Sequence, residues 1–316
     1  MWYNESGRTV GTGVRNERRF FMLHKKKILA FGEVIWDIYP EEQVIGGAPL
    51  NFAAHSAACG VKSYLLSGVG ADELGIAAME KIRDFGVKTD FVQTVQAAPT
   101  GQCLVKLNAR SVPSYNVLKN VAYDGICLTE DDLAQVRAQK FDVLYFGTLI
   151  QRDMISRSAL SALLEACDFE DIFCDLNLRP DCYDADSVSL CLRNATILKI
   201  SDEEEPILRK MGFYHCFSDS PEAIAKAIAA RYGNLKHILI TCGAKGSMQY
   251  VTESGECFHQ SIVKVPVVST VGAGDSFSAA WLSAHLDGLP PTTCLRKAAE
   301  LSAFVVSRRE AVPKKQ

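Results

Sequence analysis

The chain has 316 residues, of which 48% are hydrophobic and 22% are charged, and its formal net charge is -3 at pH 7. This length suits one large α/β domain or two average ones, with enough apolar residues for a sizeable core. Lys and Arg form no basic stripe, which argues against a nucleic-acid partner. No run of about 18 apolar residues occurs, which argues against a membrane span.

The cysteines point to a reducing compartment. There are 11 of them, an odd number, and none forms a CxxC pair. Several, such as Cys103, Cys174 and Cys242, lie in apolar runs, where a free cysteine behaves as a small hydrophobe. We therefore expect neither a disulfide framework nor a zinc site, and we interpret the chain as a cytoplasmic protein.

Residues 1–27 precede the first clear strand and form a basic segment. This segment lacks the uninterrupted apolar stretch of a secretory signal, and Met22 could be an internal start. We therefore treat residues 1–27 as an N-terminal extension and residues 28–316 as the folded domain.

Short apolar runs alternate with helical patterns from residue 28 onward. We expect buried strands at 28–31 and 64–69. A helix is expected at 49–59, with a proline at its start and Gly60 after its end. A second helix is expected over 73–85, closed by Gly86.

The stretch 88–126 departs from this rhythm because it lacks a helical pattern. Short strands with polar alternation are expected at 91–95, 102–107 and 114–118, with a turn at 109–113. These strands predict a small antiparallel sheet inserted in the α/β core. Such an insert is either a surface meander or a lid over an active site.

The second half of the chain resumes the alternation. Thr129 is a good N-cap for a helix that follows it. The expected strands are 143–146, 172–176, 197–200 and 238–241, and the expected helices are 156–167, 186–193, 202–211 and 221–232, with helical structure again from 274 to about 307. Unbroken apolar strands alternating with helices predict a mostly parallel sheet covered on both faces.

The run TVGAGDSFSA at 270–279 is the most informative motif, because it reads as a glycine-rich turn that opens into an apolar helix. Free backbone N–H groups at Gly272, Ala273 and Gly274, together with the helix dipole, favour an anion such as phosphate. Asp275, in the first turn, could take a proton from a hydroxyl group beside that anion. The run predicts a phosphotransferase that acts on an alcohol; the alternative is an aspartate that only caps the helix.

Three motifs in order resemble those of the ribokinase-type sugar kinases, the PfkB carbohydrate kinase family. They are GEVIWD at 32–37, GGAPLN at 46–51 and the run at 270–277, and the resemblance covers about residues 28–310. It implies a ribokinase-like α/β fold, with a central mostly parallel sheet, helices on both faces and a small β-sheet lid. The lid would comprise roughly residues 88–126 plus part of 37–48. ATP and Mg²⁺ are the implied cofactors.

Further segments resemble bacterial-type fructokinases, which implies fructose as the acceptor. They are Pro40 after the first motif, VPSY at 112–115, AYD at 122–124 and DLNLRP at 175–180. Other acceptors remain open, namely ribose, 2-keto-3-deoxygluconate or a nucleoside. A sugar-binding protein of the same fold without turnover is also open. We reject a nicotinamide dehydrogenase, because the glycine spacing at 68–75 does not fit a dinucleotide motif.

The resemblance also implies roles for individual residues. Asp275 would be the general base, Gly272, Ala273 and Gly274 would stabilise the transferring phosphoryl group, and Arg179 would bridge its oxygens. The implied sugar-binding residues are Asp37, Gly46, Gly47, Asn51 and Asn177. The alternatives are a strand-end turn residue for Asp37, a polar first-turn residue for Asn51, and an ion pair of Arg179 with Asp181 or Asp184.

The implied nucleotide side is carried by two segments. The run at 199–204 resembles the family segment with an NxxE motif, with Lys199 at its start, Ser201 in place of the asparagine, and Glu204 organising Mg²⁺ through water. Glu205 is a rival, and an acidic helix start is the alternative. The run at 241–246 resembles a nucleotide-binding loop in which Thr241 and Gly243 meet ATP phosphates and Gly246 shapes the turn; an ordinary hairpin turn is the alternative.

Two departures from the family pattern concern its monovalent-cation site. Ser269 stands where many relatives have aspartate, and Glu310 stands where many have glycine. They leave activation by potassium open. The resemblance further implies a homodimer paired through the lid.

Overall fold

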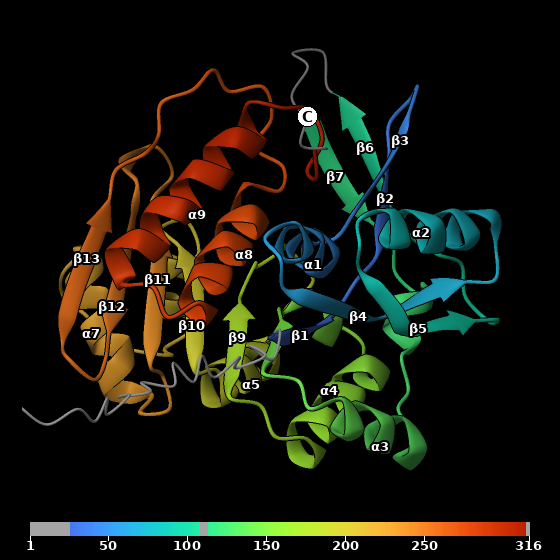
Figure 1. Cartoon of the computed structure of the whole chain (residues 1–316), viewed down its shortest axis with the longest axis horizontal. Coiled ribbons are helices and arrows are strands. Elements are labelled where there is room, and N and C mark those ends of the chain that lie inside the picture. The colour runs from blue at the N-terminus through green and yellow to red at the C-terminus, as the bar shows by residue number, and fades with distance from the viewer. Residues whose placement is uncertain (1–25, 108–112, 314–316) are drawn as a thin grey trace, which may run out of the picture.

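The computed structural model describes residues 26–107 and 113–313 (Figure 1). The proposed N-terminal extension, apart from its last two positions, lies outside the described residues, as does most of the turn predicted at 109–113. All 11 cysteines lie within the described part, and each is a free thiol. None of the described helices is long and apolar enough to cross a membrane.

A nine-stranded sheet forms the centre of the molecule, in the order β13-β12-β11-β10-β9-β8-β1-β4-β5. All neighbours from β11 to β5 pair in parallel, which confirms the predicted parallel sheet. An antiparallel hairpin that we did not predict, β12 and β13, extends one edge. The strands are β1 (Lys27–Phe31), β4 (Lys62–Gly70), β5 (Lys88–Val95), β8 (Val143–Phe146), β9 (Asp171–Asp175), β10 (Ile197–Ser201), β11 (His237–Thr241), β12 (Ser247–Val251) and β13 (Glu256–Gln260).

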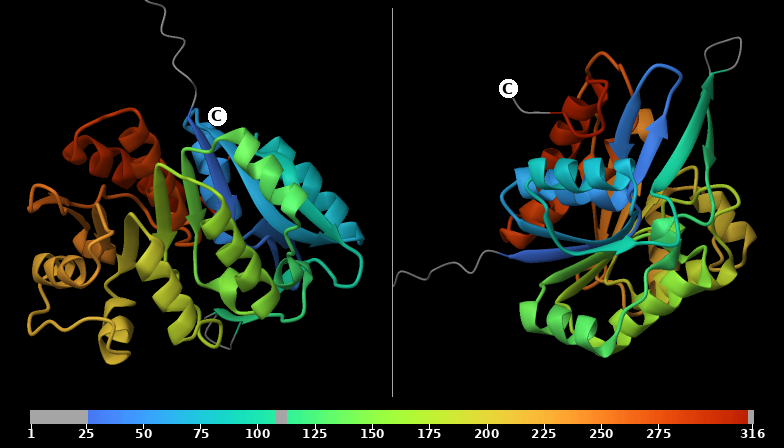
Figure 2. Two further views of the ribbon diagram at one scale, coloured as in Figure 1. Left: turned by 90° about the horizontal axis from the view of Figure 1, so that it is seen from below. Right: turned by 90° about the vertical axis from the view of Figure 1, so that its right-hand side faces the viewer.

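Helices cover both faces of this sheet, as predicted, and the right-hand view of Figure 2 shows the two layers. Strand β1 explains the arrangement, since Ile28 and Ala30 enter one hydrophobic core while Leu29 and Phe31 enter the other. The first core also contains α1 (Ala48–Ala58), α2 (Glu73–Asp84), α8 (Ala273–Leu286) and α9 (Pro291–Val306). The second contains α3 (Glu130–Gln139), α4 (Met154–Ala166), α5 (Ala185–Asn194), α6 (Glu205–Lys210) and α7 (Pro221–Arg231). Short 3-10 turns occur at η1 (Ala122–Gly125), η2 (Leu149–Gln151) and η3 (Gly243–Lys245).

A smaller four-stranded sheet, in the order β3-β2-β6-β7, stands over the carboxyl ends of the central strands (Figure 1). Its strands are β2 (Ile35–Ile38), β3 (Gln43–Gly46), β6 (Gly101–Leu107) and β7 (Pro113–Val117). The outer pairs are antiparallel, as predicted for the strands at 102–107 and 114–118, whereas β2 and β6 pair in parallel.

The start of the predicted lid segment also needs correction, because β5 joins the large sheet beside β4. Its residues alternate between half-buried and exposed, as expected for an edge strand, and this polar alternation was misleading. Phe91 packs on one core and Val92 on the other, which fixes β5 to the edge of the large sheet. Only β6 and β7 of the segment 88–126 belong to the small sheet, together with β2 and β3.

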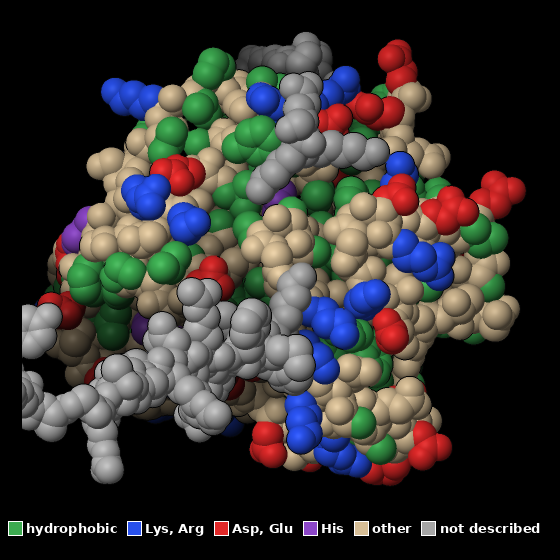
Figure 3. Space-filling view, in the orientation of Figure 1, with side chains coloured by type: hydrophobic (Ala, Val, Ile, Leu, Met, Phe, Trp, Pro, Cys, Tyr) green, Lys and Arg blue, Asp and Glu red, His purple; other side chains and the backbone are tan. Residues whose placement is uncertain are grey.

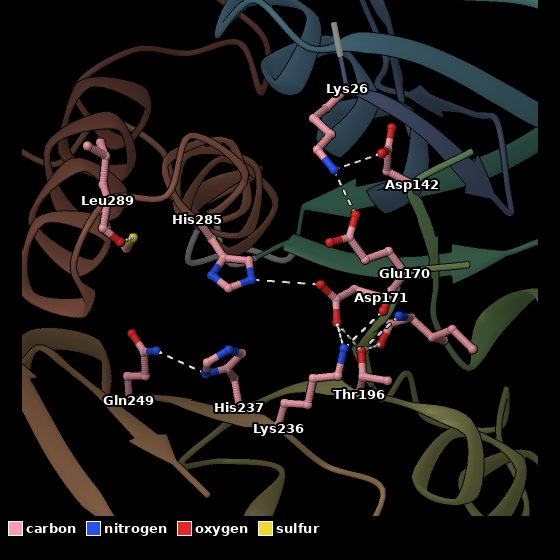
Figure 4. A network of polar contacts seen from close by, with 12 residues as sticks. Lys26, Asp142, Glu170, Asp171, Thr196, Lys236, His237, Gln249, His285 and Leu289 are labelled. Carbon is pink, nitrogen blue, oxygen red and sulfur yellow. Dashed lines mark hydrogen bonds and ion pairs between the residues drawn. The ribbon is translucent and has the colours of Figure 1, made fainter. Parts of the chain in front are cut away.

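Helix α8 is held over the large sheet by polar contacts along its length. Near its start, Ser278 donates to Asp175 at 3.1 Å, and in its middle the indole N–H of Trp281 donates to Gln249 at 3.0 Å. Near its end, His285 faces Asp171 of β9 at 3.7 Å. Figure 4 shows this last contact within a network at the amino-terminal ends of the strands, opposite the functional site.

Half-buried His237 makes this network sensitive to acid. Burial, followed by the neighbouring His285 imidazole, lowers the pKa of His237 from 6.5 to about 4. The neutral imidazole is therefore favoured in the folded state, so stability is lost as the pH falls from 6.5 towards 4. Between pH 7 and pH 5 the loss is about 2 kcal/mol.

We predict that His237→Gln loses this part of the acid sensitivity, because glutamine does not titrate. From pH 7 to pH 5 the melting temperature of the wild type should fall by roughly 5 °C more than that of the variant, measured by calorimetry. His259→Gln, on edge strand β13 with a side chain 56% exposed, is the control and should behave as wild type. Equal losses in His237→Gln and wild type would contradict the assignment.

Candidate functional site

A cavity of about 530 Å³ lies at the carboxyl ends of the central strands, under the small sheet. This edge is where open α/β sheets place their ligands. The cavity brings together most of the residues predicted from the motifs: Asp37, Gly46, Gly47, Asn51, Asn177, Arg179, Lys199, Gly272, Gly274 and Asp275. Ala273 lies between two of them on the chain, whereas Ser201, Glu204, Thr241, Gly243 and Gly246 are not among the lining residues.

Helix α8 presents an open amino terminus to this cavity. Its N-cap, Gly272, has φ 78° and provides no side-chain cap. A Cβ at this position would lie 2.8 Å from the carbonyl oxygen of Ala311, so both the backbone angle and the packing require glycine. The first backbone N–H groups of the helix lack intrahelical partners and are available to an anion.

Asp275 is buried in the first turn of α8, and its carboxylate accepts a hydrogen bond of 2.8 Å from the side-chain amide of Asn51 on α1. Burial raises its pKa to about 6, against the hydrogen bond from Asn51 and the nearby cations Lys199 and Arg179. The carboxylate therefore remains mostly ionised at pH 7. It loses its charge as the pH falls below 6.

A buried ion pair lies directly behind the glycine turn. The Lys199 ammonium is 2.9 Å from each carboxylate oxygen of Asp175, and both side chains are less than 10% exposed. Burial alone would favour the neutral amine, but the Asp175 and Glu204 carboxylates raise the pKa of Lys199. A Cβ on Gly274 would lie 3.2 Å from its Nζ, so this cation contacts the turn that would hold the phosphoryl group.

The family resemblance implied nucleotide binding for Lys199, whereas Asp175 had no predicted role. A signal for the pair was present, because each charge interrupts an otherwise apolar strand. Removing one partner would leave an uncompensated buried charge, which costs about 3–5 kcal/mol.

The small sheet forms the roof of the cavity. Val44, Asp37, Cys103 and Val117 stand in one row across its strands, and all four line the cavity. Asp37 is the only charge in the row. Burial raises its pKa to about 6, while a hydrogen bond with the Cys103 thiol and the positive charge of Arg179 act in the opposite direction. Sequence reasoning did not identify Cys103.

Gly46 and Gly47 serve different purposes at the start of α1. A Cβ on Gly46 would lie 3.9 Å from an oxygen of Asp37 and 4.0 Å from the amide nitrogen of Asn51, in the space between these two polar side chains. Gly47, the N-cap of α1, has φ 110°, and a Cβ there would lie 2.4 Å from the carbonyl oxygen of Glu33. A side chain at Gly46 would enter the space between Asp37 and Asn51, and Gly47 permits the turn.

Asn177 and Arg179 follow β9, and both line the cavity. Asn177 has φ 44°, a left-handed conformation that asparagine tolerates. The alternative in which Arg179 pairs with Asp184 is not seen, since Asp184 caps α5 and binds Arg157 at 2.7 Å. Among the described residues, no carboxylate lies within ion-pair distance of the Arg179 guanidinium.

Glu204 joins the ends of two central strands. One of its carboxylate oxygens accepts from the backbone N–H of Ser201 at 2.7 Å, and the other accepts from that of Leu178 at 2.6 Å. Its rival, Glu205, contacts Arg209 and the hydroxyl group of Tyr214 instead. Each carboxylate oxygen of Glu204 thus accepts one backbone hydrogen bond, and its contact with Mg²⁺ through water stays a prediction.

The predicted nucleotide loop begins at the end of β11, next to Ser201, which pairs with Thr241 in register. Gly243 and Gly246 have φ 51° and 101°, and a Cβ on Gly246 would lie 2.2 Å from the carbonyl oxygen of Gln260. Glycine is therefore required for the hairpin. The contacts with ATP phosphates remain predictions.

The two departures from the family pattern leave the glycine turn intact. Ser269 lines the cavity, and its hydroxyl oxygen accepts from the N–H of Val271 at 3.2 Å. Glu310 is exposed, and the following residue, Ala311, packs against Gly272. No cluster of three His, Cys, Asp or Glu side chains suited to a metal ion occurs in residues 26–107 and 113–313.

Comparison with known families identifies the fold and chemistry together. The pfkB family carbohydrate kinase profile matches residues 24–315. The chain belongs to this family. A fructokinase from Solanum tuberosum is 28% identical over 279 residues, which span 82% of this chain and 81% of the potato protein. A ribokinase from Arabidopsis thaliana is 27% identical over an alignment of 330 positions, which covers 95% of this chain and 81% of the plant enzyme.

A solved structure supports the same architecture. A ribokinase II from E. coli, in complex with ATP and Mg²⁺, superposes with a TM-score of 0.76 at 20% identity. The superposition covers 91% of this chain and 94% of that chain. This superposition shows that the chain has the ribokinase-like fold. The relatives include both a fructokinase and a ribokinase, so the comparisons support a sugar kinase and do not select its acceptor sugar.

Gly46→Ala tests whether the space between Asp37 and Asn51 binds the acceptor. The added methyl group fits sterically but occupies this space, so we predict at least a tenfold rise in the KM for the sugar. The KM for ATP and the melting temperature should stay near wild type. Gly47→Ala is the contrasting variant and should lower the melting temperature, because its Cβ would collide with Glu33. An unchanged sugar KM in Gly46→Ala would refute the assignment.

Proposed function

We propose that this PfkB kinase is an ATP-dependent fructokinase, which transfers the γ-phosphate of ATP to the 6-hydroxyl group of fructose. The hydrogen bond between Asn51 and Asp275 carries the proposal. It joins the helix that follows the sugar-binding motif to the helix whose open amino terminus suits a phosphoryl group. A base, an anion cradle and an acceptor space therefore meet in one cavity.

In the proposed reaction the sugar binds between Asp37 and Asn51, with its primary hydroxyl group next to Asp275. Asp275 accepts the hydroxyl proton as the oxygen forms a bond to the γ-phosphorus. The bond from that phosphorus to the bridging oxygen of ADP breaks. The transition state of such a transfer is loose, so positioning and charge stabilisation dominate.

The charge that develops on the transferring group is met from two directions. The backbone N–H groups of Gly272, Ala273 and Gly274 lie at the amino terminus of α8, where that of Ala273 also donates to the carbonyl of Thr270 at 3.3 Å. The unpaired Arg179 guanidinium can bridge phosphoryl oxygens. Lys199 adds a positive charge behind Gly274. The glycine turn and Lys199 are held by packing and by the Asp175 ion pair before the substrate arrives, so this part of the site requires little reorganisation.

The nucleotide side of the proposal rests on the segments next to the cavity. We assign the ATP phosphates to Thr241, Gly243 and Gly246, with Ser201 beside them. Mg²⁺ commonly keeps several waters and is held mainly by substrate phosphates, so an ion that contacts Glu204 through water fits this side of the site. When bound, the ion would neutralise charge on the phosphates.

The surroundings of the acceptor space favour a neutral sugar. The carboxylates of Asp37 and Asp275 line this part of the cavity, and the positive charge of Arg179 acts on both. An acceptor with its own carboxylate would add a further negative charge to this group. Together with the potato fructokinase relative, this supports fructose over 2-keto-3-deoxygluconate.

Two further proposals concern the state of the protein in the cell. We propose a homodimer paired through the small sheet, whose edge strands β3 and β7 each have only one neighbouring strand. We also propose a cytoplasmic location, because 11 free thiols suit a reducing compartment. Figure 3 shows acidic and basic side chains spread over one face, without a contiguous basic area.

The test of the function is ATP consumption with Mg²⁺ across fructose, ribose, glucose, 2-keto-3-deoxygluconate and adenosine. We predict that kcat/KM for fructose exceeds that for each other acceptor at least tenfold. Preferred turnover of another acceptor would keep the kinase chemistry and refute fructose. Sugar binding by calorimetry without turnover of any acceptor would indicate a non-catalytic sugar-binding protein.

A further inference from the structure

Glu33 is a buried carboxyl group in the cavity that the motifs did not assign to a function. It follows the end of β1, the strand at the centre of the site, and is 4% exposed. It lines the same cavity as Asp275 and Asn51. Glutamate is rarely buried to this extent without a partner, so its contacts need an explanation.

One oxygen of Glu33 holds the start of α1. Its Oε1 accepts a hydrogen bond of 3.1 Å from the backbone N–H of Ala48, the first residue of the helix. The N-cap of α1, Gly47, cannot provide a side-chain cap, and its Cα packs against the Glu33 backbone. Glu33 therefore supplies from a neighbouring strand the cap that the helix lacks.

This contact is linked to the proposed base through one turn of helix. Asn51 lies in the first turn of α1, its backbone N–H donates to the carbonyl of Gly47, and its side chain donates to Asp275. A shift of the helix start would move the amide that orients Asp275. A displacement of about 1 Å at a reacting group can cost 10²-fold in rate.

The groups that face Glu33 come from four elements. They are Asp275 on α8, Arg179 after β9, Tyr123 in η1 and Tyr145 on β8. No described Lys, Arg or His lies within ion-pair distance of Glu33. Burial, and to a smaller extent the Asp275 charge, raises the pKa of Glu33 to about 7, against the Ala48 N–H and Arg179.

We propose that Glu33 is a positioning residue of the acceptor site, which anchors α1 through Ala48 and works in its protonated form so that Asp275 carries the negative charge. Two carboxyl groups in one cavity thus take different protonation states, as in other paired-acid sites. The inference rests on the proposed kinase function for its kinetic consequences. Its protonation state can be tested without turnover.

Two variants separate the anchor from the charge. Glu33→Gln keeps an oxygen that can accept from Ala48 and stays neutral at every pH. Glu33→Ala removes the anchor. With fructose and ATP at pH 7, kcat/KM of the glutamine variant should lie within about threefold of wild type, whereas that of the alanine variant should fall at least tenfold, with part of the loss in kcat.

The pH profile distinguishes positioning from a general structural effect. From pH 7 to pH 9, kcat/KM of wild type should decline as Glu33 ionises, and Glu33→Gln should show a smaller decline. Equal losses in the glutamine and alanine variants at pH 7, or no loss in the alanine variant, would overturn the proposal. So would identical pH profiles of Glu33→Gln and wild type.

Thermal unfolding provides the readout that does not depend on turnover. Because the folded pKa of about 7 lies above the usual glutamate pKa of 4.5, the contribution of Glu33 to stability is fully present below pH 4.5 and is lost as the pH rises from 4.5 through 7. We therefore compare the difference in melting temperature, Glu33→Gln minus wild type, at two pH values. This difference should be at least about 3 °C larger at pH 8 than at pH 5. The exposed control Glu80→Gln should show no such change.

The two readouts separate the two proposals. If wild type phosphorylates no acceptor but Glu33→Gln shows the pH-dependent melting shift, the proposed function fails and the protonated Glu33 stands. If wild type turns over fructose but the melting shift is absent, Glu33 is not the protonated carboxyl group and the inference fails.

Discussion

The hydrogen bond between Asn51 and Asp275 is the contact around which the site is organised. It requires helices α1 and α8, which are separated by most of the chain, to begin at the same point in space. Both helices start at a glycine with positive φ, Gly47 and Gly272, and neither glycine offers a side-chain cap. The first turn of α8 is therefore open to a ligand, whereas Glu33 binds the first N–H of α1, and the two helices pack against one another beyond the site (Figure 1).

Buried charge is the second constraint, and the chain balances it locally. Lys199 and Asp175 neutralise one another behind the glycine turn, and Ser278 of α8 adds a hydrogen bond to the same carboxylate. The site therefore has a positive charge beside the place of phosphoryl transfer and still buries no isolated ion there. Asp275 keeps its own charge at neutral pH because Asn51 and two cations offset its burial.

The sequence predicted the sheet and most of the site because both are encoded locally. Apolar strands, proline helix starts and the GAGD turn at 272–275 are short-range patterns, and the motifs that follow the strands meet at one edge of a parallel sheet. Strand β5 was assigned to the small sheet because an edge strand and a lid strand share the same polar alternation. Only its pairing with β4 distinguishes them.

The residues that sequence reasoning missed act through contacts distant in the chain. Glu33 and Asp175 are single acids within apolar segments, and their importance depends on Ala48 and Lys199, which come from other elements. The position of Cys103 beside Asp37 is set by the register between β6 and β2. An unexplained charge in a buried strand, or directly after one, was the available signal for the first two, and no comparable signal existed for Cys103.

The most direct test of the central claim is single-turnover phosphoryl transfer by Asp275→Asn, with fructose binding measured by calorimetry on the same sample. Asparagine can still accept the hydrogen bond from Asn51 but cannot accept a proton. Fructose affinity should therefore stay within about threefold of wild type, while the transfer rate falls by roughly 10²- to 10⁴-fold. A transfer rate within tenfold of wild type, with fructose bound, would contradict the role of Asp275 as the base.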